Sequence, residues 1–351
     1  MNHRLSILYV AYPLLAVTDE SAGGAEQMLL ALEREMSRAG HRTTVAAADG
    51  SRVCGRLLAT GAPAVGLDQY EAREREHNAR ILSYLREHPR EFDLVHDESG
   101  SFFRLADESP VPVLGTLHLP RSFYREEWFK PASNLHLNCV SHSQARAFDG
   151  SADTLGVIPN GIAVEQFPFT RDKDDYVLWL GRICEEKAPH LAIAAAQHAG
   201  FSIVLAGQIY PFSYHQNYFE REIRPQLNGR VRFVDTPLAL QKIELLRHAR
   251  ALLVTSTVEE TSSLVAIEAM ACGTPVIAFR RGALPEIVAD SKTGLIVDTI
   301  EEMAEALGHV QCILPDICRA RVGKHFTASR MAREYEELYR RVLLSAKQWA
   351  A

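Results

Sequence analysis

The sequence predicts an α/β protein made of two parallel-sheet domains, and three observations support this prediction. Short β-branched apolar runs alternate with amphipathic segments along the whole chain, as parallel strands joined by crossover helices do. The length of 351 residues favours two domains, at roughly 100 to 200 residues for each. A polar stretch rich in turn-forming residues, 159–161 followed by 168–175, interrupts the alternation and is the expected linker.

The first half contains apolar runs with the length and composition of buried strands. They span residues 5–12, 43–48, 92–96, 112–118 and 136–141. Helices fit between them at 25–38, which Gly40 ends, and at 71–86, whose charge run we expect to be a solvated face.

The second half repeats this plan, with helix-like segments after each apolar run. The expected strands span residues 176–181, 202–207, 231–234, 251–256, 275–279 and 294–297. The tail, 329–349, has the pattern of one long helix rich in Arg, Glu and Tyr. Because it follows the last strand, it must pack as an appendage.

Composition excludes several classes of protein. Hydrophobic residues at 47% and charged residues at 23% argue against disorder and fibrous repeats. A formal charge of −6 gives no basic footprint, so no nucleic-acid partner is expected. No apolar run reaches the roughly 18 residues of a membrane span, and the first is too short for a signal peptide, so we expect a cytoplasmic protein. The 6 cysteines form no C-x-x-C pair, so neither a disulfide nor structural zinc is expected.

Gly23 and Gly24 stand at the start of the helix that follows the first strand. Glycines there let backbone N–H groups approach an anion, and a helix N-terminus adds positive partial charge. The spacing is neither G-x-G-x-x-G nor a Walker sequence, so a dehydrogenase or a P-loop protein is excluded. A flexible turn is the alternative interpretation.

Arg182 and Lys187 come just after the first strand of the second half. Ligands bind at the carboxyl ends of strands in α/β folds, where an Arg and a Lys can bracket a diphosphate, Arg through forked hydrogen bonds and Lys as a point charge. The alternative is that both cations pair with Glu185 and Glu186 on the surface.

The segment 260–273 is the most informative one, because it leaves a strand and enters a short helix near Ser262. Backbone N–H groups at this helix start are available to a phosphate, and they belong to Thr261, Ser262, Ser263 and Leu264. Glu260 lies in the turn, and Glu268 lies about two turns into an otherwise apolar helix. An ionised Glu268 is costly there unless groups such as two hydroxyls pair with it. An exposed helix edge is the alternative.

His118 ends an apolar strand and is expected to face the cleft between two such domains, although a structural histidine is the alternative. The acidic run 172–175 precedes a strand and is expected to be solvated. H-E-x-x-H, G-x-S-x-G and paired zinc ligands are absent, so the sequence predicts no metal site.

Together these residues resemble the retaining, nucleotide-sugar-dependent glycosyltransferases of family 4, which have the GT-B fold of two Rossmann-like domains facing a cleft. The resemblance covers nearly the whole chain, and the Glu pair and the motif after it are its most specific parts. Its motifs follow the family's order: Gly23-Gly24-x-Glu26, Thr116-Leu117-His118, Val140-Ser141-His142-Ser143, Val157-Ile158-Pro159-Asn160-Gly161, Gly181-Arg182-x4-Lys187, Glu260-x7-Glu268 and Gly273-Thr274-Pro275-Val276.

The resemblance implies an acceptor domain at 1–167, a donor domain at 168–328, and a C-terminal helix, 329–351, that crosses back to the first domain. Arg182 and Lys187 would hold the donor diphosphate, together with the turn after Glu260. Glu268 would bind the ribose hydroxyls, and Glu260 the donor sugar. From the other domain, Gly23 and Gly24 would approach the phosphate, and His118 would touch the sugar near the reacting centre.

The chain departs from the family pattern in three places. Thr261-Ser262-Ser263 stands where the family usually has Gly-Phe-Gly, which leaves the sugar open, although hydroxyls there could still bond phosphate oxygens. Ala163 stands in place of an Asp, and Ala188 in place of a Gly.

The expected function is a metal-independent transfer of a sugar, with retained anomeric configuration, from a nucleoside diphosphate sugar to an acceptor hydroxyl. A UDP- or GDP-sugar is the expected donor, the acceptor is a glycan, a lipid or a small molecule, and no cofactor is expected. Peripheral contact with a membrane is left open. The alternatives are a GT-B epimerase or phosphorylase, or a two-domain protein that binds a sugar without chemistry.

Overall fold

The computed structural model of the chain describes residues 4–19, 23–64, 67–129, 132–148 and 154–349. It divides into two compact units, each with its own parallel sheet. The first unit comprises Met1–Gly161 and Ala328–Ala351, and the second comprises Ile162–Thr327. The boundary lies at 161/162, whereas the sequence placed it at 167/168.

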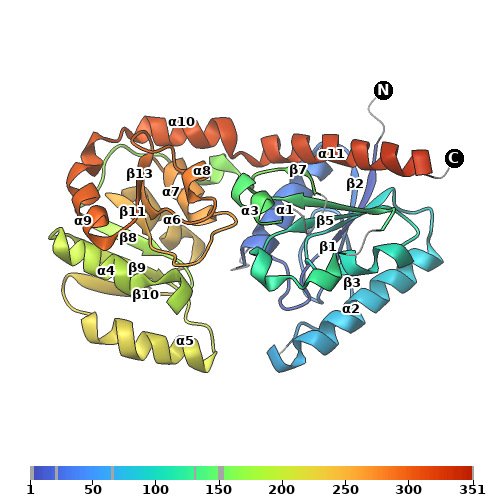
Figure 1. The fold of residues 1–351 in the computed structure, drawn as a ribbon, viewed down its shortest axis with the longest axis horizontal. Helices are drawn as coiled ribbons and strands as arrows, with labels where there is room; N and C mark the ends of the chain where they lie inside the picture. The colour runs from blue at the N-terminus through green and yellow to red at the C-terminus, as the bar shows by residue number, and fades with distance from the viewer. Residues whose placement is uncertain (1–3, 20–22, 65–66, 130–131, 149–153, 350–351) are drawn as a thin grey trace. The chain divides into compact units, whose positions relative to one another are not determined.

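The first unit is built on a seven-stranded sheet with the strand order β3-β2-β1-β4-β5-β6-β7 (Figure 1). All of its neighbouring strands pair in parallel. The strands are β1 Ser6–Val10, β2 Arg42–Ala47, β3 Arg56–Ala59, β4 Leu94–Asp97, β5 Val113–Leu117, β6 Leu135–Cys139 and β7 Thr154–Val157. The direction of the strand order reverses at β1, between β2 and β4.

Helices α1 (Gly24–Arg38), α2 (Leu67–Glu87), α3 (His142–Ala147) and α11 (Ala328–Trp349) belong to the same unit. In α1, Met28, Leu32 and Met36 are spaced four apart and are buried, so one face of the helix packs inward. Helix α11 packs against α1 (Figure 1) and buries Tyr335 and Tyr339. The predicted return of the C-terminal helix to the first domain is therefore confirmed.

The second unit is built on a six-stranded parallel sheet with the order β10-β9-β8-β11-β12-β13. Its strands are β8 Tyr176–Leu180, β9 Ser202–Gly207, β10 Val231–Asp235, β11 Ala251–Val254, β12 Val276–Phe279 and β13 Gly294–Val297. Its helices are α4 Pro189–His198, α5 Ser213–Tyr218, α6 Ala239–His248, α7 Leu264–Ala271, α8 Leu284–Ile287, α9 Ile300–His309 and α10 Pro315–His325. The strand order reverses between β8 and β11, which is where such sheets bind ligands.

The predicted strands are confirmed, but two edge strands were missed. β3 is short and its side chains are exposed or half-buried, and β7 contains Gly156. Each is a short segment with little apolar pattern, whereas the edge strands of the second sheet, β10 and β13, were predicted.

The two parts of the expected linker differ. The first part, 159–161, ends where the two units divide, whereas the second part, 168–175, packs on the second unit. Lys173 Nζ donates to the carbonyl of Arg247 and to Thr274 Oγ1, at 2.7 and 2.8 Å. Gly273, with φ of 81°, leaves room for the ring of Phe169. The carboxylates of the acidic run are exposed, as expected.

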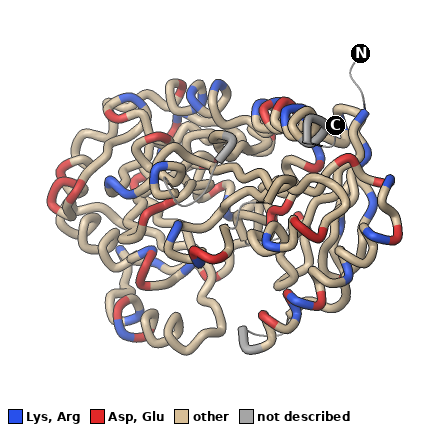
Figure 2. Tube along the Cα trace, turned by 45° about the vertical axis from the view of Figure 1, so that its right-hand side comes forward, with Lys and Arg blue, Asp and Glu red and all other residues tan. Residues whose placement is uncertain are grey.

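Basic and acidic residues are interspersed over both units (Figure 2). None of the helices in the described part of the chain combines the length and the apolar character of a membrane-spanning segment.

Candidate functional site

The candidate site lies at the carboxyl edge of β8 and β11, which pair side by side. Arg182 follows β8, and the 3₁₀ turn η5 (Glu185–Lys187) comes next. The loop after β11 leads through Glu260 to α7. Two segments that the sequence singled out separately therefore leave adjacent strands at the same edge of the sheet.

Lys187 and Glu260 join these two segments directly. The Lys187 ammonium forms an ion pair with Oε1 of Glu260, and the Ser256 hydroxyl donates to the same oxygen. The side chain of Glu260 is 10% exposed and that of Lys187 is 29% exposed. Lys187 thus pairs with Glu260, across two loops, and not with Glu185 or Glu186 as the surface-pair alternative required.

A glycine holds the Glu260 turn in place. Gly282 has φ of 54°, and its Cα lies so close to the Glu260 backbone that any Cβ would collide with it. The Ala283 N–H donates to the Glu260 carbonyl at 2.7 Å. The turn therefore rests on the backbone after β12, which orients the Glu260 carboxylate toward Lys187.

Arg182 is exposed, and its guanidinium lies over the ring of Tyr210, 5.6 Å from the ring centroid. No carboxylate within the described ranges forms an ion pair with it. Its five N–H donors point out of a fixed planar fork, a shape that suits phosphate oxygens. The structure therefore leaves Arg182 available to an anionic ligand beside Lys187.

Glu268 is buried in α7, with 3% of its surface exposed, so the exposed-edge alternative is wrong. Its Oε1 accepts from Lys242 Nζ at 2.7 Å, across the contact between α6 and α7. Its Oε2 is buried and has no hydrogen-bond partner. The sequence analysis missed Lys242, because only helix packing brings it to Glu268. One carboxylate oxygen thus remains for a ligand that donates hydrogen bonds.

Helix α7 begins at Leu264, later than the predicted start near Ser262. Ser263 precedes it in an extended conformation, and its hydroxyl does not cap the helix. N–H groups in the first turn of a helix have no intrahelical partner. Thr261 and Ser262 lie half-buried before them, in the turn where the sequence predicts phosphate binding.

In the first unit, Gly24 opens α1 and Gly23 precedes it in an extended conformation. The Glu26 carboxylate folds back over Gly23, where any Cβ would collide with it. Burial raises the pKa of Glu26, although its own backbone N–H and the nearby His118 oppose the shift. A larger residue at position 23 would therefore displace the Glu26 carboxylate.

His118 follows β5 and donates to, or accepts from, Glu98 through Nε2. Glu98 is 2% exposed, and its other oxygen lies 3.2 Å from Nε2 of His96. Burial alone would raise the pKa of Glu98, but His96 and His118 outweigh burial and lower it. His118 is therefore oriented by a buried carboxylate. Sequence analysis missed Glu98, although it follows β4 at the same edge as His118 follows β5.

A buried network connects this pair of histidines with α11. His96 Nδ1 lies 2.7 Å from the Tyr339 hydroxyl, and His96 Nε2 lies 2.7 Å from Thr116 Oγ1. Thr116 in turn bonds to the hydroxyl of Tyr335 at 3.1 Å. Burial lowers the pKa of His96 to about 4, so its ring is neutral near pH 7. The C-terminal helix thus contributes to the surroundings of His118.

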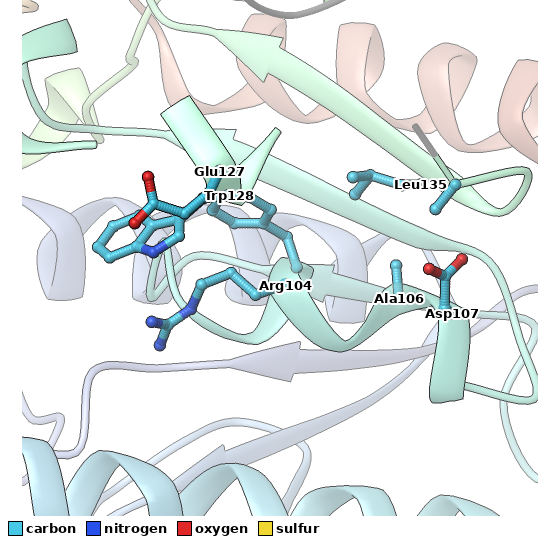
Figure 3. A pocket seen from close by; sticks show the side chains of 8 residues that line it. Arg104, Ala106, Asp107, Glu127, Trp128 and Leu135 are labelled. Atoms are coloured by element: carbon cyan, nitrogen blue, oxygen red, sulfur yellow. The ribbon is translucent and has the colours of Figure 1, made fainter. Parts of the chain in front are cut away.

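A pocket of about 260 Å³ opens elsewhere in the first unit. Figure 3 shows Arg104, Asp107, Glu127 and Trp128 around it, and the Arg104 guanidinium lies 4.7 Å from the Trp128 ring centroid. None of the predicted site residues lines this pocket.

A group of metal-ligand side chains gathers beside Arg182 in the described part of the second unit. It consists of Cys184, Glu186 and His215. The sequence predicted no such group, because the three residues share no ligand motif.

Two family models match the chain, one over each half. "Glycosyltransferase Family 4" matches residues 22–166, and "Glycosyl transferases group 1" matches residues 174–311.

Among curated relatives, two D-inositol 3-phosphate glycosyltransferases are similar. The one from Mycobacteroides abscessus is 33% identical over 145 residues, 40% of this chain and 32% of that protein. The one from Corynebacterium glutamicum is 27% identical over 291 residues, 70% of this chain and 69% of that protein. The chain thus spans about a third of the length of the first relative.

Among solved structures, Alr3699/HepE of Anabaena in complex with UDP-glucose has a TM-score of 0.75. Its sequence is 17% identical, and the match covers 95% of this chain and 99% of that chain. At this identity the likeness concerns the fold, and it bears out the predicted architecture.

Proposed function

The chain belongs to glycosyltransferase family 4 and has the GT-B fold, and from this premise we propose the reaction that it catalyses. It transfers a sugar from a nucleoside diphosphate sugar to an acceptor hydroxyl, with retention of anomeric configuration and without a catalytic metal. The second unit binds the donor, and the first unit binds the acceptor.

One observation carries this proposal. The ion pair between Lys187 and Glu260 joins the loops after β8 and β11, where the strand order reverses, and Arg182 lies in the same loop as Lys187. Two cations and the start of a helix there concentrate positive potential at one point of the second unit. A diphosphate is the ligand whose charge and length suit such a site.

Arg182 binds one phosphate of the donor through its planar fork. An ammonium has three N–H donors, so Lys187 can keep its bond to Glu260 while it donates to a phosphate oxygen. The backbone N–H groups at the start of α7 add further donors. Donors placed where negative charge develops on a leaving group contribute about 3 kcal/mol each to the lowering of the barrier.

The two glutamates bind different parts of the donor. The unpartnered Oε2 of Glu268 accepts from the ribose hydroxyls, while Oε1 keeps its bond to Lys242. Glu260 accepts hydrogen bonds from hydroxyls of the transferred sugar. Its bond to Lys187, which donates to the diphosphate, fixes the position of the sugar relative to the diphosphate. With Glu268 on the ribose and Glu260 on the transferred sugar, the donor is held at both of its ends, and this orients the anomeric carbon.

Residues of the first unit complete the site in this proposal. Gly23 and Gly24 expose backbone N–H groups at the start of α1 to the donor phosphate. His118, oriented by Glu98, bonds to the sugar near the reacting carbon.

The chemistry follows from these positions. The bond between the anomeric carbon and the diphosphate oxygen breaks, and the acceptor oxygen bonds to the same face of that carbon. The acceptor proton passes to the departing phosphate oxygen. Glu260 is tied to Lys187 and Ser256, which favours a role in binding over a role as a covalent nucleophile.

UDP-glucose is the first donor to test, because the similar structure from Anabaena binds it. GDP-sugars come next. A small polyol phosphate is the first acceptor to test, because two relatives are named for D-inositol 3-phosphate, and glycan and lipid acceptors follow.

The test is a panel of donors with and without acceptor, followed by proton NMR of the products. Slow hydrolysis of one donor without acceptor, and a glycoside with the donor's anomeric configuration with acceptor, are the expected results. Binding of a donor with no turnover would favour a sugar-binding protein. A changed sugar on an intact nucleotide would favour an epimerase, and phosphate-dependent release of a sugar phosphate would favour a phosphorylase.

A further inference from the structure

Three side chains of different chemistry converge where β8 ends. One ligand atom each from Cys184, Glu186 and His215 lies within 4.8 Å of the other two. Cys184 precedes η5 and Glu186 lies in it, whereas His215 comes from α5. The cluster therefore joins the loop after β8, which contains Arg182, to α5, the helix that follows β9 in the chain.

His215 is the part of the cluster that calls for a ligand. Its residue is 1% exposed, and neither Nδ1 nor Nε2 has a hydrogen-bond partner among the residues that the structure describes. Its neighbours are the rings of Tyr210, Phe212 and Tyr214, whose centroids lie 5.8, 5.5 and 4.2 Å from its own. These rings hold the imidazole in place and leave both of its nitrogens unbonded. Buried polar atoms are nearly always paired, so His215 is poised for a partner that the protein itself does not supply.

Cys184 and Glu186 face His215 because of the backbone between them. Cys184 is extended, with φ of −157° and ψ of 165°, and the chain then turns into η5. The buried thiol lies 3.5 Å from the carbonyl of Arg182, a long contact, and it also hydrogen-bonds to the Glu186 carboxylate. A thiol is a weak hydrogen-bond donor, so a sulfur–metal bond would replace only weak contacts. Glu186 is exposed and gives the cluster an opening to solvent.

We propose that Cys184, Glu186 and His215 bind a divalent transition-metal ion, with Zn²⁺ as the preferred one. Thiolate, imidazole and carboxylate are the ligands that zinc accepts, whereas Ca²⁺ and Mg²⁺ take oxygen ligands. Three protein ligands leave a fourth position for water. Bonds of about 2.0 to 2.3 Å would draw the ligand atoms somewhat closer together than they lie now. Binding releases the Cys184 thiol proton to solvent as the sulfur–metal bond forms.

The ion has a positional role in this account. It cross-links the loop after β8, which includes Arg182 two residues before Cys184, to α5. The proposed transfer does not pass through the ion, because Arg182 and Lys187 supply the charge. Zinc binding and sugar transfer are therefore independent of each other, and each is measured in its own experiment.

The experiment titrates Co²⁺ and Zn²⁺ into the full-length chain without a histidine tag, after treatment with chelator. A tetrahedral Co²⁺–thiolate complex gives visible and near-ultraviolet bands, and Zn²⁺ should displace Co²⁺ at one equivalent. We expect Cys184→Ser and His215→Gln to weaken binding by at least about 100-fold, since changes even outside the ligand shell cost roughly 10- to 100-fold. Glu186→Gln should weaken binding less, because the other two ligands remain.

Cys312→Ser is the matched control, because Cys312 is an exposed thiol of the same unit. It should bind both ions as the unaltered chain does. Equal affinity in all the variants, or loss of the bands in Cys312→Ser, would show adventitious binding and overturn the proposal.

Alkylation of the unaltered chain tests the proposal even if one of the variants does not fold. Zn²⁺ should slow iodoacetamide labelling of Cys184 in the unaltered chain, with no change at Cys312. Unchanged labelling of Cys184 under saturating Zn²⁺ would overturn the proposal independently of the variants.

Discussion

Lys187 and Glu260 form an ion pair that connects the loop after β8 with the loop after β11. The pair is largely withdrawn from solvent, so each charge depends on the other. Arg182 stands beside it with its guanidinium over Tyr210. The two cations of the proposed diphosphate site therefore differ in their contacts: Lys187 pairs with a carboxylate, whereas Arg182 lies over an aromatic ring.

Substitution of the two cations should separate binding from stability. Arg182→Ala should weaken binding of a nucleoside diphosphate roughly 10- to 150-fold, at about 1.5 to 3 kcal/mol per charged hydrogen bond, and leave nucleoside binding unchanged. Lys187→Ala should weaken binding similarly and also lower the melting temperature, because it leaves Glu260 without its cation. Calorimetry and thermal unfolding measure both. Unchanged diphosphate affinity in both variants would remove the diphosphate site from this edge.

Glu98→Gln tests the orientation of His118. The amide cannot carry the charge that pairs with His118, so turnover should fall and the pH profile of kcat should shift, while KM for the donor changes little. His118→Ala should lower turnover at least as much. A glutamine variant with the kcat profile of the unaltered enzyme would assign Glu98 and His118 to structure alone.

His77 should make the first unit sensitive to acid. Burial, with a smaller effect from Arg73, lowers the pKa of His77 from 6.5 to about 3 in the folded chain. Between these values the unfolded chain binds more protons than the folded one, so stability is present above pH 6.5 and is lost as pH falls toward 3. One such group contributes a slope of up to about 1.4 kcal/mol per pH unit. Denaturant unfolding from pH 7 to pH 4 should therefore show a shallower decline for His77→Gln. Equal slopes in both proteins would contradict this.

Excess EDTA should leave sugar transfer intact, because Arg182, Lys187 and the start of α7 already supply the positive charge. If zinc is bound at Cys184 and His215, the chelator should lower the melting temperature. Activity that EDTA abolishes and Mg²⁺ or Mn²⁺ restores would contradict a metal-independent transfer.

The central strands could be predicted because each is a buried run of apolar residues. β3 and β7 could not, since β3 has no buried side chain and Gly156 interrupts β7, so neither leaves a clear apolar pattern in the sequence. The unit boundary was placed too late because polarity alone does not show that Lys173 is held by three acceptors of the second unit.

The same distinction holds for the site. The meeting of the Lys187 and Glu260 segments could be predicted because both follow strands that end at the same edge of the sheet. Glu98 could have been found by that rule. Lys242 and His215 could not, since each reaches its neighbours only through the packing of a helix that no local motif describes.

The central claim is that Glu268 binds the ribose and Glu260 binds the sugar of one donor at this edge. Calorimetric titration of UDP and of UDP-glucose into Glu268→Ala and Glu260→Ala, followed by the rate of transfer, tests it most directly. Glu268→Ala should weaken both ligands alike, whereas Glu260→Ala should bind UDP nearly as the unaltered chain does and lose turnover. Weaker UDP binding in Glu260→Ala alone would reverse the two roles. Full affinity and full turnover in both variants would contradict the donor site itself.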